Sequence, residues 1–136
     1  MVEETIIKTV DLNCYYGSLH VLKNLNLEIY KNEILGIIGP ANSGKTTFLR
    51  ALNRLNNLNP AYRQQGDIFF EGHNANDMTD NLLRKKIGII FAMPQVLPVS
   101  IYNNIAYGPK VHGITDRRTV SEIVENALKK AYLWDE

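Results

Sequence analysis

The nine residues 39–47 set the tightest limits on the structure of this chain. They read Gly-Pro-Ala-Asn-Ser-Gly-Lys-Thr-Thr, which fits the pattern G-x-x-x-x-G-K-[ST]. The five residues before them, 34–38, form a continuous apolar run that predicts a strand buried on both faces. Apolar residues then recur at the spacing of one helix face, at Phe48, Leu49, Leu52 and Leu55. The sequence therefore predicts a buried strand that turns through glycines into a helix, as in an α/β fold.

The residue types in this loop suit a phosphate group. Gly39 and Gly44 let the backbone turn tightly and come close to a ligand. Loop N–H groups then form a nest for phosphate oxygens, and the helix that begins near Lys45 adds the positive end of its dipole. The residues expected to contact a bound nucleotide are Gly39, Pro40, Ala41, Asn42, Ser43, Gly44, Lys45, Thr46 and Thr47.

Three side chains of the loop have distinct expected roles. Lys45 reaches the terminal phosphates as a point charge and is the candidate catalytic residue. The Thr46 hydroxyl is the candidate ligand for a Mg²⁺ ion that bridges those phosphates, and Thr47 is placed to donate to an inner phosphate. ATP and Mg²⁺ are therefore the expected cofactors. The N-K-x-D and D-x-x-G motifs that GTPases need do not occur in the sequence, whereas a small-molecule kinase stays possible on the loop alone.

Length and charge narrow the remaining classes. A chain of 136 residues suits one domain. Its net charge of +1 gives no electrostatic basis for binding nucleic acid. The single cysteine and the absence of a secretory signal or a long apolar stretch favour a cytoplasmic protein. The three histidines are scattered, so no metal cluster is expected.

Other elements follow from periodicity and turn residues. Strands are expected over residues 5–16, 25–29 and 67–72, a turn over 31–33, a second doubly buried strand over 87–91, and a helical turn over 82–86. The clearest helix carries an apolar face from Val120 to Ala131. Thr119 with Glu122 fits a capping box, and Glu125 with Lys129 fits an i,i+4 ion pair.

The flanks of the loop resemble the ATP-binding subunits of ABC (ATP-binding-cassette) transporters along almost the whole chain. Tyr15-Tyr16-Gly17, followed by residues 21–25, is similar to the segment that brings an aromatic ring to the adenine, and Tyr16 matches the ring that stacks on the base. The resemblance implies an α/β P-loop core with an N-terminal antiparallel β region. It also implies that residues 1–136 are the N-terminal part of one nucleotide-binding domain, incomplete at the C-terminus.

Within this family the phosphate-import branch is the most similar. Residues 52–58, 100–114 and 133–136 carry that likeness. The likeness implies an ATPase of the inner face of the cell membrane, peripheral and cytoplasmic. Its partners would be a second copy of the subunit and the transmembrane permease subunits, and ATP hydrolysis would drive phosphate inward.

Two departures from the family pattern bear on turnover. The family places a glutamine after its second buried strand, near Mg²⁺ and the attacking water, and Ala92 stands there. The L-S-G-G-Q signature, the apolar strand ending in Asp-Glu and the switch histidine do not occur in the sequence. We therefore expect the isolated chain to bind ATP but to hydrolyse it poorly. A nucleotide-binding or docking module without turnover remains the alternative, beside the kinase.

Overall fold

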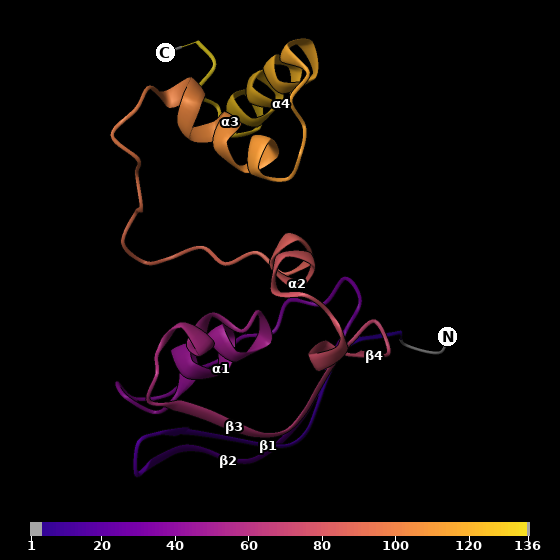
Figure 1. Cartoon of the computed structure of the whole chain (residues 1–136), viewed down its shortest axis with the longest axis vertical. Helices are drawn as coiled ribbons and strands as arrows, with labels where there is room; N and C mark the ends of the chain where they lie inside the picture. The colour runs from indigo at the N-terminus through magenta and orange to yellow at the C-terminus, as the bar shows by residue number, and fades with distance from the viewer. Residues whose placement is uncertain (1–3, 136) are drawn as a thin grey trace. The chain divides into compact units, whose positions relative to one another are not determined.

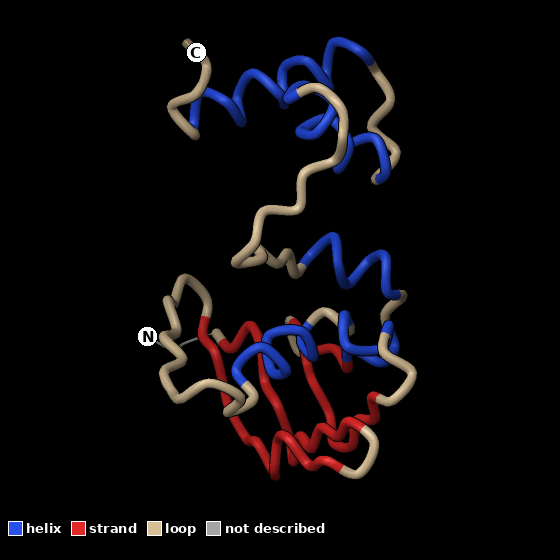
Figure 2. Tube along the Cα trace, turned by 90° about the vertical axis from the view of Figure 1, so that its left-hand side faces the viewer, coloured by secondary structure: helices blue, strands red, loops and turns tan. Residues whose placement is uncertain are grey.

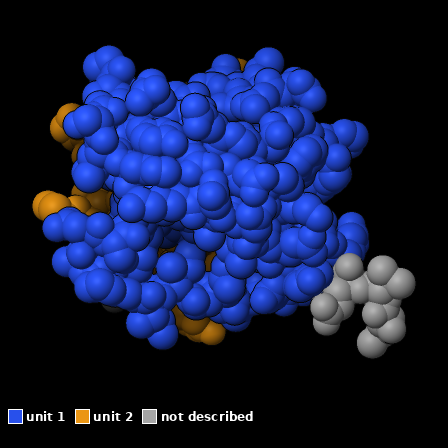
Figure 3. Space-filling model, turned by 90° about the horizontal axis from the view of Figure 1, so that it is seen from below, with its two compact units in different colours: residues 1–89 blue, residues 90–136 orange. Residues whose placement is uncertain are grey.

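A computed structural model describes residues 4–135 of the chain. They divide into two compact units, one ending at residue 89 and one beginning at residue 90, which Figure 3 shows in different colours. Each unit has a hydrophobic cluster of its own. Among the described residues, no helix combines the length and the apolar character needed to cross a membrane.

The first unit is built on an antiparallel sheet. Its strands are β1 (Thr5–Tyr16), β2 (Leu19–Tyr30), β3 (Tyr62–Phe70) and β4 (His73–Asn74), in the order β2-β1-β3-β4 (Figure 1). This sheet confirms the antiparallel β region expected at the N-terminus. β2 and β3 are longer than the segments predicted from alternation alone, because strand pairing with β1 extends both.

One face of this sheet is covered by helix (Figure 2). α1 (Lys45–Leu52) lies there, followed by the 3-10 turns η1 (Leu55–Leu58) and η2 (Ala75–Asp77) and by α2 (Asp80–Lys86). α2 confirms the predicted helical turn, and the Thr79 side chain caps it by accepting a hydrogen bond from the N–H of Leu82.

The core lies between the sheet and these helices. It consists of Leu12, Cys14, Phe48, Ala51, Leu52, Ile68, Ala75 and Leu83. Removing this apolar surface from water is the main stabilising term, at about 25 cal/mol per Å². Phe48 and Leu52 are buried as the helical spacing predicts, but Leu49 is 45% exposed. Leu55 lies beyond α1 because the helix ends at Leu52.

Both predicted doubly buried strands are wrong for this chain. Residues 34–38 and 87–91 form no strand, and the exposed fractions of Ile34, Ile38 and Ile90 are 98%, 99% and 99%. A parallel strand forms only where neighbouring strands bond to its edges. All four strands among the described residues belong to the antiparallel sheet and pair elsewhere. Both segments therefore have the apolar composition of buried strands but do not form strands.

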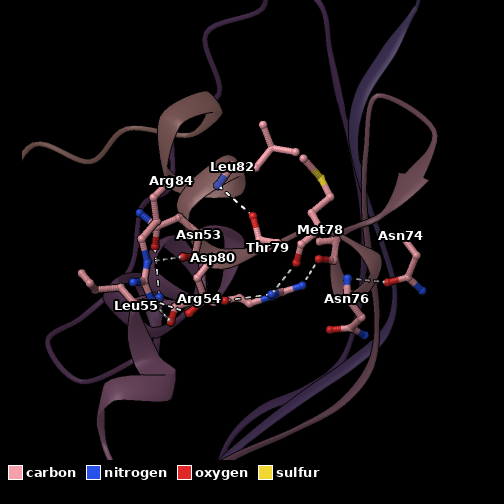
Figure 4. A network of polar contacts seen from close by, with 11 residues as sticks. Asn53, Arg54, Leu55, Asn74, Asn76, Met78, Thr79, Asp80, Leu82 and Arg84 are labelled. Carbon is pink, nitrogen blue, oxygen red and sulfur yellow. Dashed lines mark hydrogen bonds and ion pairs between the residues drawn. The ribbon is translucent and has the colours of Figure 1, made fainter. Parts of the chain in front are cut away.

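A polar network joins the end of α1 to α2 (Figure 4). The guanidinium of Arg54 donates to the carbonyl oxygens of Ala75 and Met78, the latter at 2.9 Å, and to Asp80 Oδ1 at 2.8 Å. Arg84 donates to Asp80 Oδ2 at 3.0 Å and to the carbonyl oxygen of Arg54 at 3.1 Å. One carboxylate thus receives two arginines, and the chain segments that follow α1 are fixed to one another.

The second unit is a helix pair, α3 (Ile101–Val111) and α4 (Arg117–Lys130), packed through Ala106, Val120 and Val124. α4 confirms the predicted helix, and Lys129 Nζ lies 2.5 Å from Glu125 Oε1 as predicted.

The predicted capping box of α4 is wrong. The helix begins earlier, and Asp116 is the N-cap, accepting from the N–H of Thr119 at 2.8 Å and from its hydroxyl at 2.7 Å. α3 has no counterpart among the predicted elements. Its Ser100 cap, which accepts from the N–H of Asn103, is the signal that would have located its start.

Candidate functional site

Gly44 joins the loop to α1 and packs tightly against β2. Its φ of 93° lies in the left-handed region, where a residue with a Cβ is strained. A Cβ at this position would come within 2.8 Å of Leu22 Cδ2 and 3.2 Å of Val21 Cγ1. The backbone conformation therefore favours glycine here, and a Cβ would in addition displace the Leu22 side chain.

The helix that follows offers unpaired N–H groups. The first intrahelical hydrogen bond runs from the N–H of Phe48 to the carbonyl of Gly44, at 2.9 Å, and no side chain caps the helix. The N–H groups of Lys45, Thr46 and Thr47 precede that bond, so the helix supplies them with no acceptor. No acidic side chain occupies the first turn of α1. This end of the helix is suited to an anion.

The Lys45 side chain folds back over the loop. Its Nζ donates to the carbonyl oxygens of Gly39 at 2.8 Å and Pro40 at 2.5 Å, and to Ser43 Oγ at 3.1 Å. All three acceptors are neutral dipoles, so they orient the ammonium group without cancelling its charge. The loop thus holds a full positive charge where the motif predicts one.

A pocket of about 300 Å³ lies beside the loop. It is lined by Tyr16, Leu19, Val21 and residues 42–47. The structure therefore brings Tyr16, which comes from the far end of β1, together with six of the nine predicted loop residues. Gly39 and Pro40 line a neighbouring, mainly apolar pocket of about 500 Å³, which also includes Ser43, Gly44 and Lys45. Ala41 is exposed in the turn between the two groups.

Tyr16 is held by groups that the sequence patterns did not indicate. Its hydroxyl donates to Asn56 Oδ1 at 2.8 Å, and its ring lies 5.3 Å from that of Tyr62 at an interplanar angle of 53°. Asn56 Nδ2 in turn donates to the carbonyl oxygen of Thr47 at 2.8 Å. Asn56 falls within residues 52–58, which carry the family likeness, but no sequence pattern assigns it a role at the site.

The floor behind Tyr16 is uncharged. Burial raises the pKa of the Cys14 thiol, an effect that its hydrogen bond with Tyr62 partly offsets. Burial, followed by the hydrogen bond with Cys14, also raises the pKa of Tyr62. The Sγ of Cys14 and the hydroxyl oxygen of Tyr62 are 3.0 Å apart. Both groups are neutral near pH 7, so the ring of Tyr16 rests on a neutral support.

Ala92, which stands at the expected glutamine position, lies in an exposed bend of the second unit. Gln95 is nearby in sequence, and its Nε2 donates to the carbonyl oxygen of Met93 at 3.4 Å.

Known proteins resemble this chain in sequence and in fold. The model of the ABC transporter family matches residues 22–135. A phosphate import ATP-binding protein, PstB, of Borreliella afzelii (strain PKo) is 46% identical over 135 residues, which is 98% of this chain and 52% of the relative. The chain thus spans about half the length of this curated relative.

Two solved structures share the fold. A bacterial Atm1-family ABC exporter with ATP bound superposes with a TM-score of 0.76 at 26% identity, over 99% of this chain and 22% of the exporter chain. The cbiO1 protein of Clostridium perfringens, part of the ABC transporter complex cbiONQ, superposes with a TM-score of 0.75 at 31% identity, over 93% of this chain and 50% of cbiO1. With the family model matched over most of its length, this chain belongs to the ABC transporter family.

Proposed function

We propose that this chain is the ATP-binding part of an ATPase subunit that drives phosphate import, and that residues 1–136 form the N-terminal part of one nucleotide-binding domain. The observation that carries the proposal is the pocket that joins Tyr16 to residues 42–47. Its volume of about 300 Å³ is at the lower end of the range for small-molecule sites. The likeness to a phosphate import ATP-binding protein supports the transported substrate.

Each end of the pocket suits one part of ATP. The ring of Tyr16 offers a flat aromatic face to the adenine. The unpaired N–H groups at the start of α1 and the ammonium of Lys45 suit the phosphates. The predicted contact residues at this end remain Gly39, Pro40, Ala41, Asn42, Ser43, Gly44, Lys45, Thr46 and Thr47.

Mg²⁺ would be held by phosphate oxygens together with the hydroxyl of Thr46, which lines the pocket. Within residues 4–135, no group of three or more His, Cys, Asp or Glu side chains could hold the ion by itself. When bound, the ion would neutralise charge on the phosphates. The chain's own contribution is to bind, orient and neutralise through Lys45 and the loop N–H groups.

Turnover is the step that these residues support least. Phosphoryl transfer to water needs a group that positions the water. The described residues that line the pocket include no carboxylate and no glutamine. This favours a second candidate function, a nucleotide-binding or docking module without turnover. Membership of the ABC transporter family argues against the P-loop kinase.

The proposed partners are those of an import ATPase. They are the transmembrane permease subunits and a second copy of the ATPase subunit, assembled at the cytoplasmic face of the cell membrane. The similar cbiO1 protein is part of a transporter complex, which supports the assembly with other subunits.

Calorimetric titration of the chain with Mg-ATP tests the proposal. We expect saturable binding that Lys45→Ala weakens at least about tenfold, as expected for the loss of a charged phosphate contact. Phosphate release measured in the same samples separates the two candidate functions. Lys45-dependent release would exclude the module without turnover, and a folded chain that binds no Mg-ATP would contradict both.

A companion variant, Ala92→Gln in a full-length subunit, tests the role of the missing glutamine. If a side chain that orients water is what the chain lacks, this variant raises the rate of phosphate release while the dissociation constant for ATP stays the same. An unchanged rate in a chain that does hydrolyse ATP would show that Ala92 is not the cause of slow turnover.

A further inference from the structure

The buried side chain of Asn56 connects the two ends of the pocket. Asn56 is 3% exposed and comes from η1, a segment that does not line the pocket itself. Its amide makes two hydrogen bonds of 2.8 Å, accepting from the Tyr16 hydroxyl and donating to the carbonyl of Thr47. A single side chain therefore fixes the end of β1 to the helix that carries the phosphate loop.

This connection is built from three elements. The sheet register places Tyr16 opposite Tyr62, and the tilted contact between their rings limits the positions open to Tyr16. η1 then presents Asn56 to the hydroxyl end of the same ring. A tyrosine held both at its ring and at its hydroxyl has lost most of its rotational freedom before a ligand arrives.

Preorganisation of this kind matters for binding. A side chain that is ordered only when the ligand binds loses conformational entropy at that moment, which weakens the affinity. An anchored Tyr16 avoids that loss. The benefit concerns the base alone, because phosphates contact the loop and not the ring.

The hydrogen bond from Asn56 to the carbonyl of Thr47 matters less for phosphate binding than the bond to Tyr16 matters for the base. The carbonyl of Thr47 lies within α1, where the i→i+4 pattern already supplies a backbone donor. Loss of the amide N–H would leave that carbonyl bonded. The hydroxyl of Tyr16, by contrast, has Asn56 Oδ1 as its anchor.

We propose that Asn56 is a positioning residue that holds Tyr16 for an adenine ring, and that it thereby sets the preference of the pocket for a nucleotide over a bare phosphate chain. The inference rests on the proposed nucleotide-binding function. It extends that function to a residue outside the pocket, which acts through Tyr16.

Binding of Mg-ATP and of Mg-tripolyphosphate, which has three phosphates and no base, tests this inference on the whole chain. Asn56→Ala should weaken ATP binding about fivefold, the size of one net hydrogen bond, and leave tripolyphosphate binding within about twofold. Tyr16→Phe, which keeps the ring and removes only the hydroxyl, should give the same selective loss. The double variant should bind ATP no more weakly than the single variant with the lower affinity, because both substitutions remove the same hydrogen bond.

Asn53→Ala is the matched control. Asn53 is also 3% exposed and precedes the same turn, but its amide bonds to the carbonyl of Ile87 and to the N–H of Leu55. Its replacement should lower stability without changing the ratio of the two dissociation constants. If Asn56→Ala does not fold, Tyr16→Phe decides the question.

The outcomes separate the inference from the proposed function. Three results would overturn the role of Asn56 and leave the proposed function standing. They are an equal loss of ATP and tripolyphosphate binding in Asn56→Ala, multiplied effects in the double variant, and native ATP affinity in Tyr16→Phe. A native chain that binds neither ligand would overturn the proposed function, and the inference with it.

Discussion

At Gly44 the loop and the start of α1 come close to the strand β2. Gly44→Ala would add a methyl group 2.8 Å from Leu22 Cδ2 at a φ of 93°. We expect the free energy of unfolding to fall by about 1–3 kcal/mol, from overpacking and backbone strain, and ATP binding to weaken at least about tenfold. Urea unfolding and calorimetry measure the two effects.

Gly72→Ala separates the two causes. Gly72 also has a positive φ, 79°, but a Cβ there would meet no atom within 4 Å. Its replacement should therefore show the cost of backbone strain alone and leave ATP binding unchanged. Equal effects of the two variants on binding would mean that the contact between the loop and β2 does not shape the pocket.

The contrast between the loop and Asn56 shows what sequence alone reveals of this site. The loop residues are consecutive, so their spacing predicts their chemistry and their place before a helix. Asn56 functions through a hydroxyl that is 40 positions away in the chain, and only the pairing of β1 with β3 brings the two together. Sequence periodicity contains no information on such a contact.

At the scale of elements, the Arg54 network holds the segments after α1 in place. Arg54→Ala would leave the carbonyl oxygen of Met78 without this donor and would separate Asp80 from one of its two arginines. The carbonyl oxygen of Ala75 would lose one of its two donors and keep the N–H of Met78 at 3.2 Å. We expect the free energy of unfolding to fall by about 2 kcal/mol, the size expected for the loss of hydrogen bonds from a charged donor. Thermal unfolding followed by circular dichroism measures the change.

Lys31→Ala is the matched control for that experiment. Lys31 pairs with Glu4 at 2.9 Å, but both side chains are more than half exposed. Exposed pairs of this kind add little to stability because water screens them. A loss in Lys31→Ala as large as that in Arg54→Ala would show that the buried carbonyl contacts are unimportant.

The N-cap of α4 makes the helix sensitive to acid. The side-chain hydrogen bond from Thr119, followed by that from its backbone N–H, lowers the pKa of Asp116 below its ordinary value of 3.8. A lowered folded-state pKa stabilises the helix above the unfolded value and loses that effect as the pH falls through the folded one. Helical circular dichroism should therefore decline below about pH 4.

Asp116→Asn provides the comparison, because asparagine caps helices well and does not titrate. The helical signal of Asp116→Asn should therefore not show the decrease at low pH that protonation of Asp116 causes. An identical pH profile in the two proteins would assign the transition to other carboxylates.

Elements were predictable where their own residues determine them. The pattern located β1 with its observed bounds and the apolar face of α4, whereas it found only residues 25–29 of β2. Residues 34–38 and 87–91 have the composition of parallel strands, but such strands depend on partners that no local pattern supplies. α3 was missed because the glycine and proline at 108–109 suggest a break, although the helix continues through Pro109.

For the whole molecule, the main consequence of those two segments is exposed apolar surface. Ile34, Ile38 and Ile90 are almost fully exposed, and large apolar areas in water favour association. We expect the chain to self-associate at micromolar concentrations and to bind 8-anilinonaphthalene-sulfonate.

The triple variant with serine at these positions should shift sedimentation toward the monomer without lowering stability. Leu58→Ser, at a site that is 71% exposed and lies outside these two segments, should change neither the sedimentation nor the stability. A native chain that sediments as a monomer would contradict this prediction.

The order of the pocket residues along the chain has a consequence for biosynthesis. Every residue that lines the pocket precedes Phe48, and the two that hold Tyr16, Asn56 and Tyr62, follow shortly after. A nascent chain leaves the ribosome N-terminus first, but the core beneath the pocket includes Ile68, Ala75 and Leu83. The pocket is therefore complete only when most of the first unit has been made, while residues 90–136 can still follow. A ligand that binds the folded form stabilises it by mass action. Under the proposed function, ATP captured by the folded first unit would stabilise it before residues 90–136 are complete.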